Sequence, residues 1–151
     1  MTKKFLVAVD GSDHGWKALD LAVDIAKLSD AELAILHVVP YEAFPEGLKQ
    51  FAKAEGIQIE EERARYHAGR TLADAITADA AARAAKQGLA RVKTHTAEGS
   101  TAIEIAAMAK SESVDMLFLG SRGLGEVTGL LLGSVSHKVM NIAPCTCVTV
   151  K

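Results

Sequence analysis

The sequence predicts an α/β fold, an open, doubly wound, parallel five-stranded sheet with helices on both faces. Two observations predict it. Short runs rich in Val, Leu and Ile alternate along the chain with segments that have the apolar spacing of helices. The runs are apolar at consecutive positions, which is typical of strands covered on both faces. Because 151 residues with a 49% hydrophobic content can build one core, we expect a single domain over residues 1–151.

Four of the strands are predicted from their apolar runs. They cover residues 5–9, 33–39, 114–119 and 145–150. The remaining strand, residues 92–96, alternates Val92, Thr94 and Thr96 with Lys93 and His95. Since alternate residues of a strand face opposite sides, this pattern indicates a half-exposed strand near an edge of the sheet.

The first helix is predicted over residues 13–28, with Ser12 or Asp13 as its N-cap. Its apolar face is expected to contain Trp16, Leu19, Val23 and Ala26. Residues 47–88 are less regular and predict a mobile or short-helical insertion followed by a long helix. Leu72, Ile76 and Ala80 have helical spacing in that second part.

Two further helices are predicted in the second half of the chain. Thr101 and Glu104 match a T-x-x-E capping box, and the helix that they begin should turn Ile103 and Ala106 inward. A short helix over residues 134–142 should end before Pro144, because a proline disfavours helical backbone in the residue before it.

Composition argues against several classes of protein. The net charge of -2 and the scattered 17 Lys and Arg residues provide no basic field for nucleic acid. No apolar run approaches the roughly 20 residues that a membrane span needs, and the run after Met1 is too short for a signal peptide. Cys145 and Cys147 are the only cysteines, which is not a secreted disulfide framework. We therefore expect a soluble cytoplasmic protein without nucleic-acid or membrane partners.

A glycine-rich loop, residues 120–136, follows the strand predicted at 114–119 and leads into the helix predicted at 134–142. Glycine amides can approach phosphate oxygens without interference from a Cβ, and a helix start adds unpaired donors. Ser134 and Ser136 can add hydroxyl donors, and Arg122 can add positive charge. The loop therefore predicts a polyphosphate site, placed where ligands of doubly wound sheets bind, outside the carboxyl ends of the strands.

The loop spacing Gly120-x2-Gly123-x9-Gly133-Ser134 resembles the G-x2-G-x9-G-[S/T] nucleotide loop of the ATP-binding universal stress proteins. The resemblance extends to the first strand with Asp10 at its end, to Leu36-His-Val-Val39, and to the final segment from residue 143 to 150. It implies the strand order 3-2-1-4-5, ATP as ligand with Mg²⁺, and a homodimer formed through the C-terminal strand, which lies at a sheet edge.

The resemblance also implies a role for each site residue. The adenine pocket would be lined by Ala8, Val9 and Val38, and the nucleoside would be covered by Leu119 and Gly120. Asp10 would lie near the ribose and phosphates. Because a carboxylate at the end of a buried strand needs partners, Asp10 is also the residue expected to bind ribose hydroxyls or the Mg²⁺ ion. The phosphate chain would be held by Arg122, Gly123, Gly133, Ser134, Val135 and Ser136.

Several of these residues also have ordinary structural explanations. Asp10 could cap the following helix, although Ser12 and Asp13 are better placed for that. Arg122 could be a solvated loop residue. His14, His37, His67 and His95 show no spacing of metal ligands. Cys145 and Cys147 are expected to pack as small apolar residues, with a redox or metal role as the alternative.

The function predicted from the resemblance is that of an ATP-dependent regulatory homodimer in the stress response. ATP would order residues 124–132 and so change a surface that an unknown downstream protein recognises. No residue is predicted to be catalytic, because the chain lacks a G-x-x-x-x-G-K-[S/T] loop and an acidic group placed for attack on the γ-phosphate. Two alternatives stay open: slow ATP hydrolysis or self-phosphorylation on Ser134 or Ser136, and a nucleotide-independent interaction module.

Overall fold

The computed structural model describes residues 2–40, 50–51, 53–56, 60–123 and 132–151. Of the residues from 60 to 67 it describes the helical backbone only. The elements that build the fold are, in chain order, β1 (Lys4–Ala8), α1 (Asp13–Ser29), β2 (Glu32–Pro40), α3 (Glu60–Lys86), β3 (Val92–Gly99), α4 (Thr101–Ser111), β4 (Met116–Gly120), α5 (Ser134–Ile142) and β5 (Thr146–Val150).

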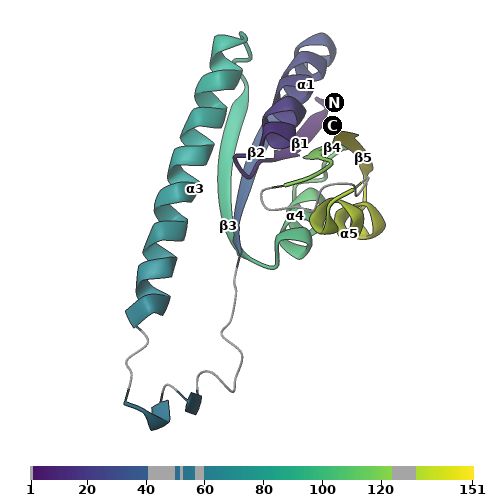
Figure 1. Ribbon diagram of the computed structural model, residues 1–151. Coiled ribbons are helices and arrows are strands. Elements are labelled where there is room, and N and C mark those ends of the chain that lie inside the picture. Colours follow the sequence, from purple (N-terminus) through teal and green to yellow (C-terminus); the bar gives the residue numbers. More distant parts are fainter. Residues whose placement is uncertain (1, 41–49, 52, 57–59, 124–131) are drawn as a thin grey trace.

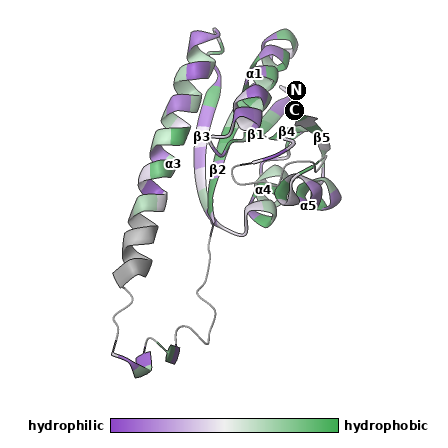
Figure 2. Cartoon of the chain, viewed as in Figure 1, coloured by the Kyte–Doolittle hydropathy of each residue, from purple (hydrophilic) through white to green (hydrophobic). Residues whose placement is uncertain are grey.

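The five strands form one parallel sheet in the order β3-β2-β1-β4-β5 (Figure 1). This confirms the predicted α/β class and strand order. β1 lies in the centre and pairs with β2 on one side and with β4 on the other. β3 and β5 are the edges, as predicted from the alternating pattern of residues 92–96 and from the resemblance. Figure 2 shows the central strands as hydrophobic and β3 as largely hydrophilic.

Two layers of helices cover the sheet, so the core has two halves. On one face Phe5, Val7 and Ile35 pack against α1 and α3. On the other face Leu6 and Leu117 pack with residues of α4 and α5. Successive residues of a strand point to opposite faces, which is why the central strands β1 and β4 carry apolar residues at consecutive positions.

The first helix begins as predicted. Ser12 is the N-cap, and its hydroxyl accepts a hydrogen bond from the Gly15 amide at 3.1 Å. Leu19, Val23 and Ala26 are buried, and Trp16 is partly buried against the same core.

The prediction for α4 is wrong by one residue. Its N-cap is Ser100, which makes no side-chain cap hydrogen bond, so Thr101 is the first helical residue and not the cap of a capping box. The buried face is correspondingly shifted. Ala102 and Ile105 point into the core, whereas Ile103, predicted to face inward, is half exposed. The short connection from β3 determines this rotation, because the strand continues to Gly99 and the helix begins two residues later.

Other boundaries differ by a few residues. β4 begins at Met116 because Val114, although buried, belongs to the turn that ends α4, where its amide donates to the Ala109 carbonyl. β3 is longer than predicted since its pairing with β2 continues to Pro40 and Gly99. The insertion predicted before α3 falls mainly on residues outside the described part of the chain.

Candidate functional site

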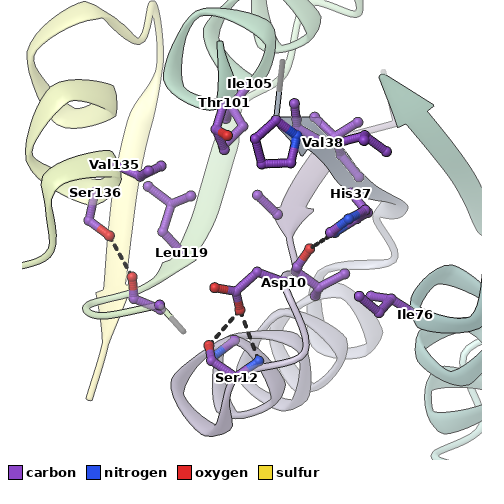
Figure 3. Close-up of a pocket in the computed structure, with 18 of the residues that line it drawn as sticks. Asp10, Ser12, His37, Val38, Ile76, Thr101, Ile105, Leu119, Val135 and Ser136 are labelled. Carbon is purple, nitrogen blue, oxygen red and sulfur yellow. Dashed lines mark hydrogen bonds between the residues drawn. The ribbon is translucent and has the colours of Figure 1, made fainter. Parts of the chain in front are cut away.

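A pocket of about 430 Å³ lies at the carboxyl ends of β1, β2 and β4. Figure 3 shows Asp10 near its centre, with Leu119 and Val135 on one side and His37 and Ile76 on the other. The parallel sheet brings the ends of these strands together, and the N-terminal ends of α1, α4 and α5 contribute residues to the same edge. Its volume lies in the range of small-molecule sites, roughly 300–1,000 Å³.

Most of the predicted site residues meet in this pocket. Those that line it are Ala8, Val9, Asp10, Val38, Leu119, Gly120, Arg122, Gly123, Val135 and Ser136. Gly133 and Ser134 do not line it. Gly133 is the N-cap of α5, and Ser134 is the exposed first residue of that helix.

Asp10 follows β1 and is held by the start of α1. One carboxylate oxygen accepts hydrogen bonds from the Ser12 amide at 2.9 Å and from the Ser12 hydroxyl at 2.5 Å (Figure 3). Asp10 therefore supports the capping residue and does not replace it. These two bonds determine the orientation of the carboxylate in the pocket.

Three glycines let the loop and the start of α1 approach each other closely. A Cβ on Gly120 would lie 2.8 Å from the Gly15 nitrogen, and a Cβ on Gly15 would lie 2.9 Å from an Asp10 carboxylate oxygen. A Cβ on Gly123 would lie 2.6 Å from the other Asp10 oxygen. Side chains at these positions would displace either the loop or Asp10, so glycine here has a packing reason.

Arg122 supplies the unsatisfied donor of the site. Its Nε atom is buried and has no hydrogen-bond partner among the described residues. A buried polar atom of a positively charged group without a partner is costly, and such atoms are rare in folded proteins. An anion in the pocket would supply the missing acceptor.

The two serines of the loop differ in their surroundings. The Ser136 hydroxyl is buried and donates to the Gly120 carbonyl at 2.6 Å (Figure 3). Its single proton is thereby directed at the main chain and not at a ligand. Ser134 is exposed, so its hydroxyl and the amides at the start of α5 are the more accessible donors.

Sequence reasoning missed one wall of the pocket. Gly69, Leu72 and Ile76 of α3 line it, and Leu72 is 61% exposed. The spacing of Leu72 and Ile76 predicts a helix with these residues on one face. It does not show that this face reaches the carboxyl ends of β1 and β2.

Two further lining residues, Thr101 and His37, were also missed as site residues. Thr101 begins α4 at the carboxyl edge of the sheet, so the rule that pointed to the glycine loop also pointed to it. The His37 ring donates through Nδ1 to the Val9 carbonyl at 2.8 Å, which leaves Nε2 as the acceptor of the neutral ring. It ties β2 to the residue before Asp10.

The described residues contain neither a cluster of metal ligands nor a thiol activated by its surroundings. No group of three or more His, Cys, Asp or Glu side chains that could hold a metal ion occurs among them. Cys145 and Cys147 are partly buried beside the core on the α4 and α5 side. Burial raises the pKa of both thiols, so they stay protonated near neutral pH. Among the residues that the structure describes, none of the helices has the length and apolar character that a membrane span requires.

Known proteins provide an independent comparison. The model of the universal stress protein family matches residues 1–151. The chain belongs to this family. The universal stress protein YxiE of Bacillus subtilis is 36% identical over 167 residues, and the alignment covers 100% of both chains.

Solved structures of universal stress proteins share the fold. UspA from Lactobacillus plantarum superposes with a TM-score of 0.82 at 24% identity, over 99% of this chain and 97% of that one. A universal stress protein solved in complex with cAMP has a TM-score of 0.71 at 27% identity, over 99% of this chain and 97% of the other. The family assignment therefore holds in both sequence and structure, and at least one relative binds an adenine nucleotide.

Proposed function

We propose that residues 1–151 form one nucleotide-binding domain that holds ATP and works as a regulatory homodimer in the cytoplasm. One observation carries the proposal. A single pocket combines an apolar part suited to a base with a polar part suited to an anion. The apolar part includes Val38, Ile105 and Leu119, and the polar part is formed by Asp10 and the Gly120–Gly123 turn.

The anionic part of the ligand is supported by the loop. Glycine main chain faces the pocket, and the buried Arg122 Nε needs an acceptor. The start of α5 adds amide donors beside it. The relative solved with cAMP supports an adenine nucleotide as the class of ligand, and the triphosphate is our extension from the loop spacing.

Magnesium fits this arrangement in the manner usual for nucleotide sites. Mg²⁺ is commonly held by one or two carboxylates together with ligand phosphates and water, and it does not need an all-protein cage. Asp10 supplies one carboxylate in the pocket, oriented by Ser12. When bound, the ion would neutralise phosphate charge beside this carboxylate.

Calorimetric titration with ATP, with and without Mg²⁺, tests the proposal. We expect saturable binding that is tighter with Mg²⁺, and Asp10→Asn should remove most of the Mg²⁺ effect. Asp13→Asn is the matched control, because Asp13 is an exposed residue of the first turn of α1 that does not line the pocket. If no adenine nucleotide saturates the parent protein, only the fold and the family remain.

We propose that ATP in the pocket changes the segment 124–132 and thereby the recognition of this protein by its partners. Residues 124–131 lie outside the described part of the chain, so this step stays a prediction. The Ser136 hydroxyl is buried and bonded to the main chain, which argues against Ser136 as the acceptor in self-phosphorylation, whereas Ser134 is exposed. Phosphate release after mixing with Mg-ATP would distinguish a slow enzyme from a binding protein.

A further inference from the structure

Ser121 lies next to the pocket and is hydrogen-bonded to other parts of the fold. It follows Gly120 at the end of β4 and precedes Arg122, and both of these neighbours line the pocket. Ser121 itself does not line the pocket and is 1% exposed. A buried polar residue in a turn needs partners for all of its polar groups.

Each polar group of Ser121 has such a partner, and each partner belongs to a different part of the fold. Its amide donates to the Val150 carbonyl at the end of β5, at 2.7 Å. Its carbonyl accepts from the Gly133 amide at 2.6 Å, which joins the two described ends of the glycine loop. Its hydroxyl lies 3.0 Å from Nδ1 of His14 in the first turn of α1.

We propose that Ser121 is a positioning residue of the nucleotide site, so that ligand affinity depends on His14 and Val150, which lie outside the pocket. This inference rests on the proposed function. The Ser121 carbonyl sets the distance between the Gly120–Gly123 turn and the start of α5, the two groups of donors that would hold the phosphates. The bonds to α1 and β5 keep that carbonyl in place.

The physical basis is preorganisation. A loop that already has its binding geometry loses less conformational freedom when the ligand arrives, so more of the contact energy appears as affinity. Without the Ser121 hydroxyl, the turn would lose its hydrogen bond to His14. It would still be held to α1 by the packing of Gly120 against His14 and Gly15 and by the long contact, 3.5 Å, between the Ser12 hydroxyl and the Arg122 carbonyl. The loop would then lose more conformational freedom when the ligand binds, and the affinity would be lower.

Calorimetric ATP titration of Ser121→Ala measures this effect. We expect the Kd to rise about five-fold, the change that corresponds to one ordinary hydrogen bond. Ser121→Thr keeps a hydroxyl and should restore part of the affinity. Ser29→Ala is the matched control, because it also removes one hydrogen-bonded hydroxyl, which donates to the Ile25 carbonyl at the far end of α1 and does not contact the loop.

A double-mutant cycle with His14→Phe assigns the effect to the hydrogen bond. If the bond is responsible, the double variant binds ATP no more weakly than the weaker single variant. Additive effects of the two substitutions, or a parental Kd in Ser121→Ala, would overturn the inference while the proposed function stands. His14→Phe also provides a test if Ser121→Ala does not fold.

Amide exchange of Gly133, measured by NMR without nucleotide, separates this inference from the proposed function. We expect faster exchange in Ser121→Ala than in Ser29→Ala, because the Gly133 amide donates to Ser121. Equal exchange rates would refute the positioning role whatever the ligand. A parent protein that binds no adenine nucleotide but shows the exchange difference would refute the proposed function alone.

Discussion

Single residues decide how closely the loop approaches α1, and two glycines make this testable. A Cβ on Gly120 would meet main-chain atoms of His14 and Gly15 at 2.8 Å, and main chain inside a helix cannot move aside. A Cβ on Gly123 would meet the carboxylate of Asp10 at 2.6 Å, and a side chain can rotate away.

Gly120→Ala should therefore lower the free energy of unfolding by about 1–3 kcal/mol, the usual cost of overpacking. Gly123→Ala should change stability much less but weaken Mg-ATP binding, because Asp10 must turn out of position. Chemical denaturation and calorimetric titration of both variants check this. Equal losses of stability would show that the Asp10 side chain is as immobile as the helix.

At this scale the loop motif predicts several residues of the pocket, but not those that reach the pocket by tertiary packing; Gly133 and Ser134, which also belong to the motif, do not line it. Gly120, Arg122 and Gly123 were predicted because the spacing of the loop is specific. Leu72 and Ile76 were not, because nothing in a local pattern shows that α3 passes the carboxyl ends of β1 and β2.

At the scale of elements, α1 and α3 are joined by a charged cluster on the surface. Arg83 donates to both Asp20 oxygens at 2.7 and 2.6 Å, and its guanidinium lies 5.8 Å from the ring centroid of Trp16. Gln87 also donates to Asp20, at 2.7 Å. The hydrogen bond from Arg83, more than that from Gln87, holds the pKa of Asp20 below its ordinary value.

Because the pKa of Asp20 is lowered by folding, its contribution to stability is present above the unfolded pKa, near 3.9, and is lost as the pH falls through the folded value. Asp20→Asn should destabilise the protein by about 0.5–1 kcal/mol at pH 7, since the pair is partly exposed. The difference from the parent should shrink below about pH 4.

Urea denaturation at several pH values measures this difference. Asp24→Asn is the control, because Asp24 lies exposed on the same helix and has no ion pair among the described residues. A difference between Asp20→Asn and the parent that stays constant into acid would contradict the assignment.

The errors at this scale concern the rotation of α4 and the boundaries of β3 and β4, and not the existence of elements. All five predicted strands and the predicted helices 13–28, 134–142 and the one after residue 100 are present. The T-x-x-E pattern at Thr101 pointed to the right place, but the connection from Gly99, where φ is 142°, determines which residue caps the helix and which face is buried. That geometry depends on where β3 stops pairing with β2.

At the scale of the whole molecule, β5 is the strand that a second copy of the chain would extend in the proposed homodimer. Among the strands that the structure describes it pairs only with β4, and Val150 lies opposite Gly120. Since the Val150 carbonyl accepts from Ser121 beyond β4, the main-chain groups of Val150 and Val148 point toward β4. Those of Cys147 and Thr149 then point to the free edge, where an unpaired strand recruits another.

Proline at alternate positions of β5 should therefore have different effects. Thr149→Pro removes a donor from the free edge only, so we expect a folded monomer. Val148→Pro removes a donor of the hydrogen bonds between β5 and β4 and should lower the melting temperature by several degrees. Thr149→Val is the control for Thr149→Pro, because it changes the same side chain but keeps the amide, and it should remain dimeric. Sedimentation velocity over a range of concentrations, together with thermal melting, measures both effects. A dimer that survives Thr149→Pro unchanged would place the contact between copies elsewhere than on the edge of β5.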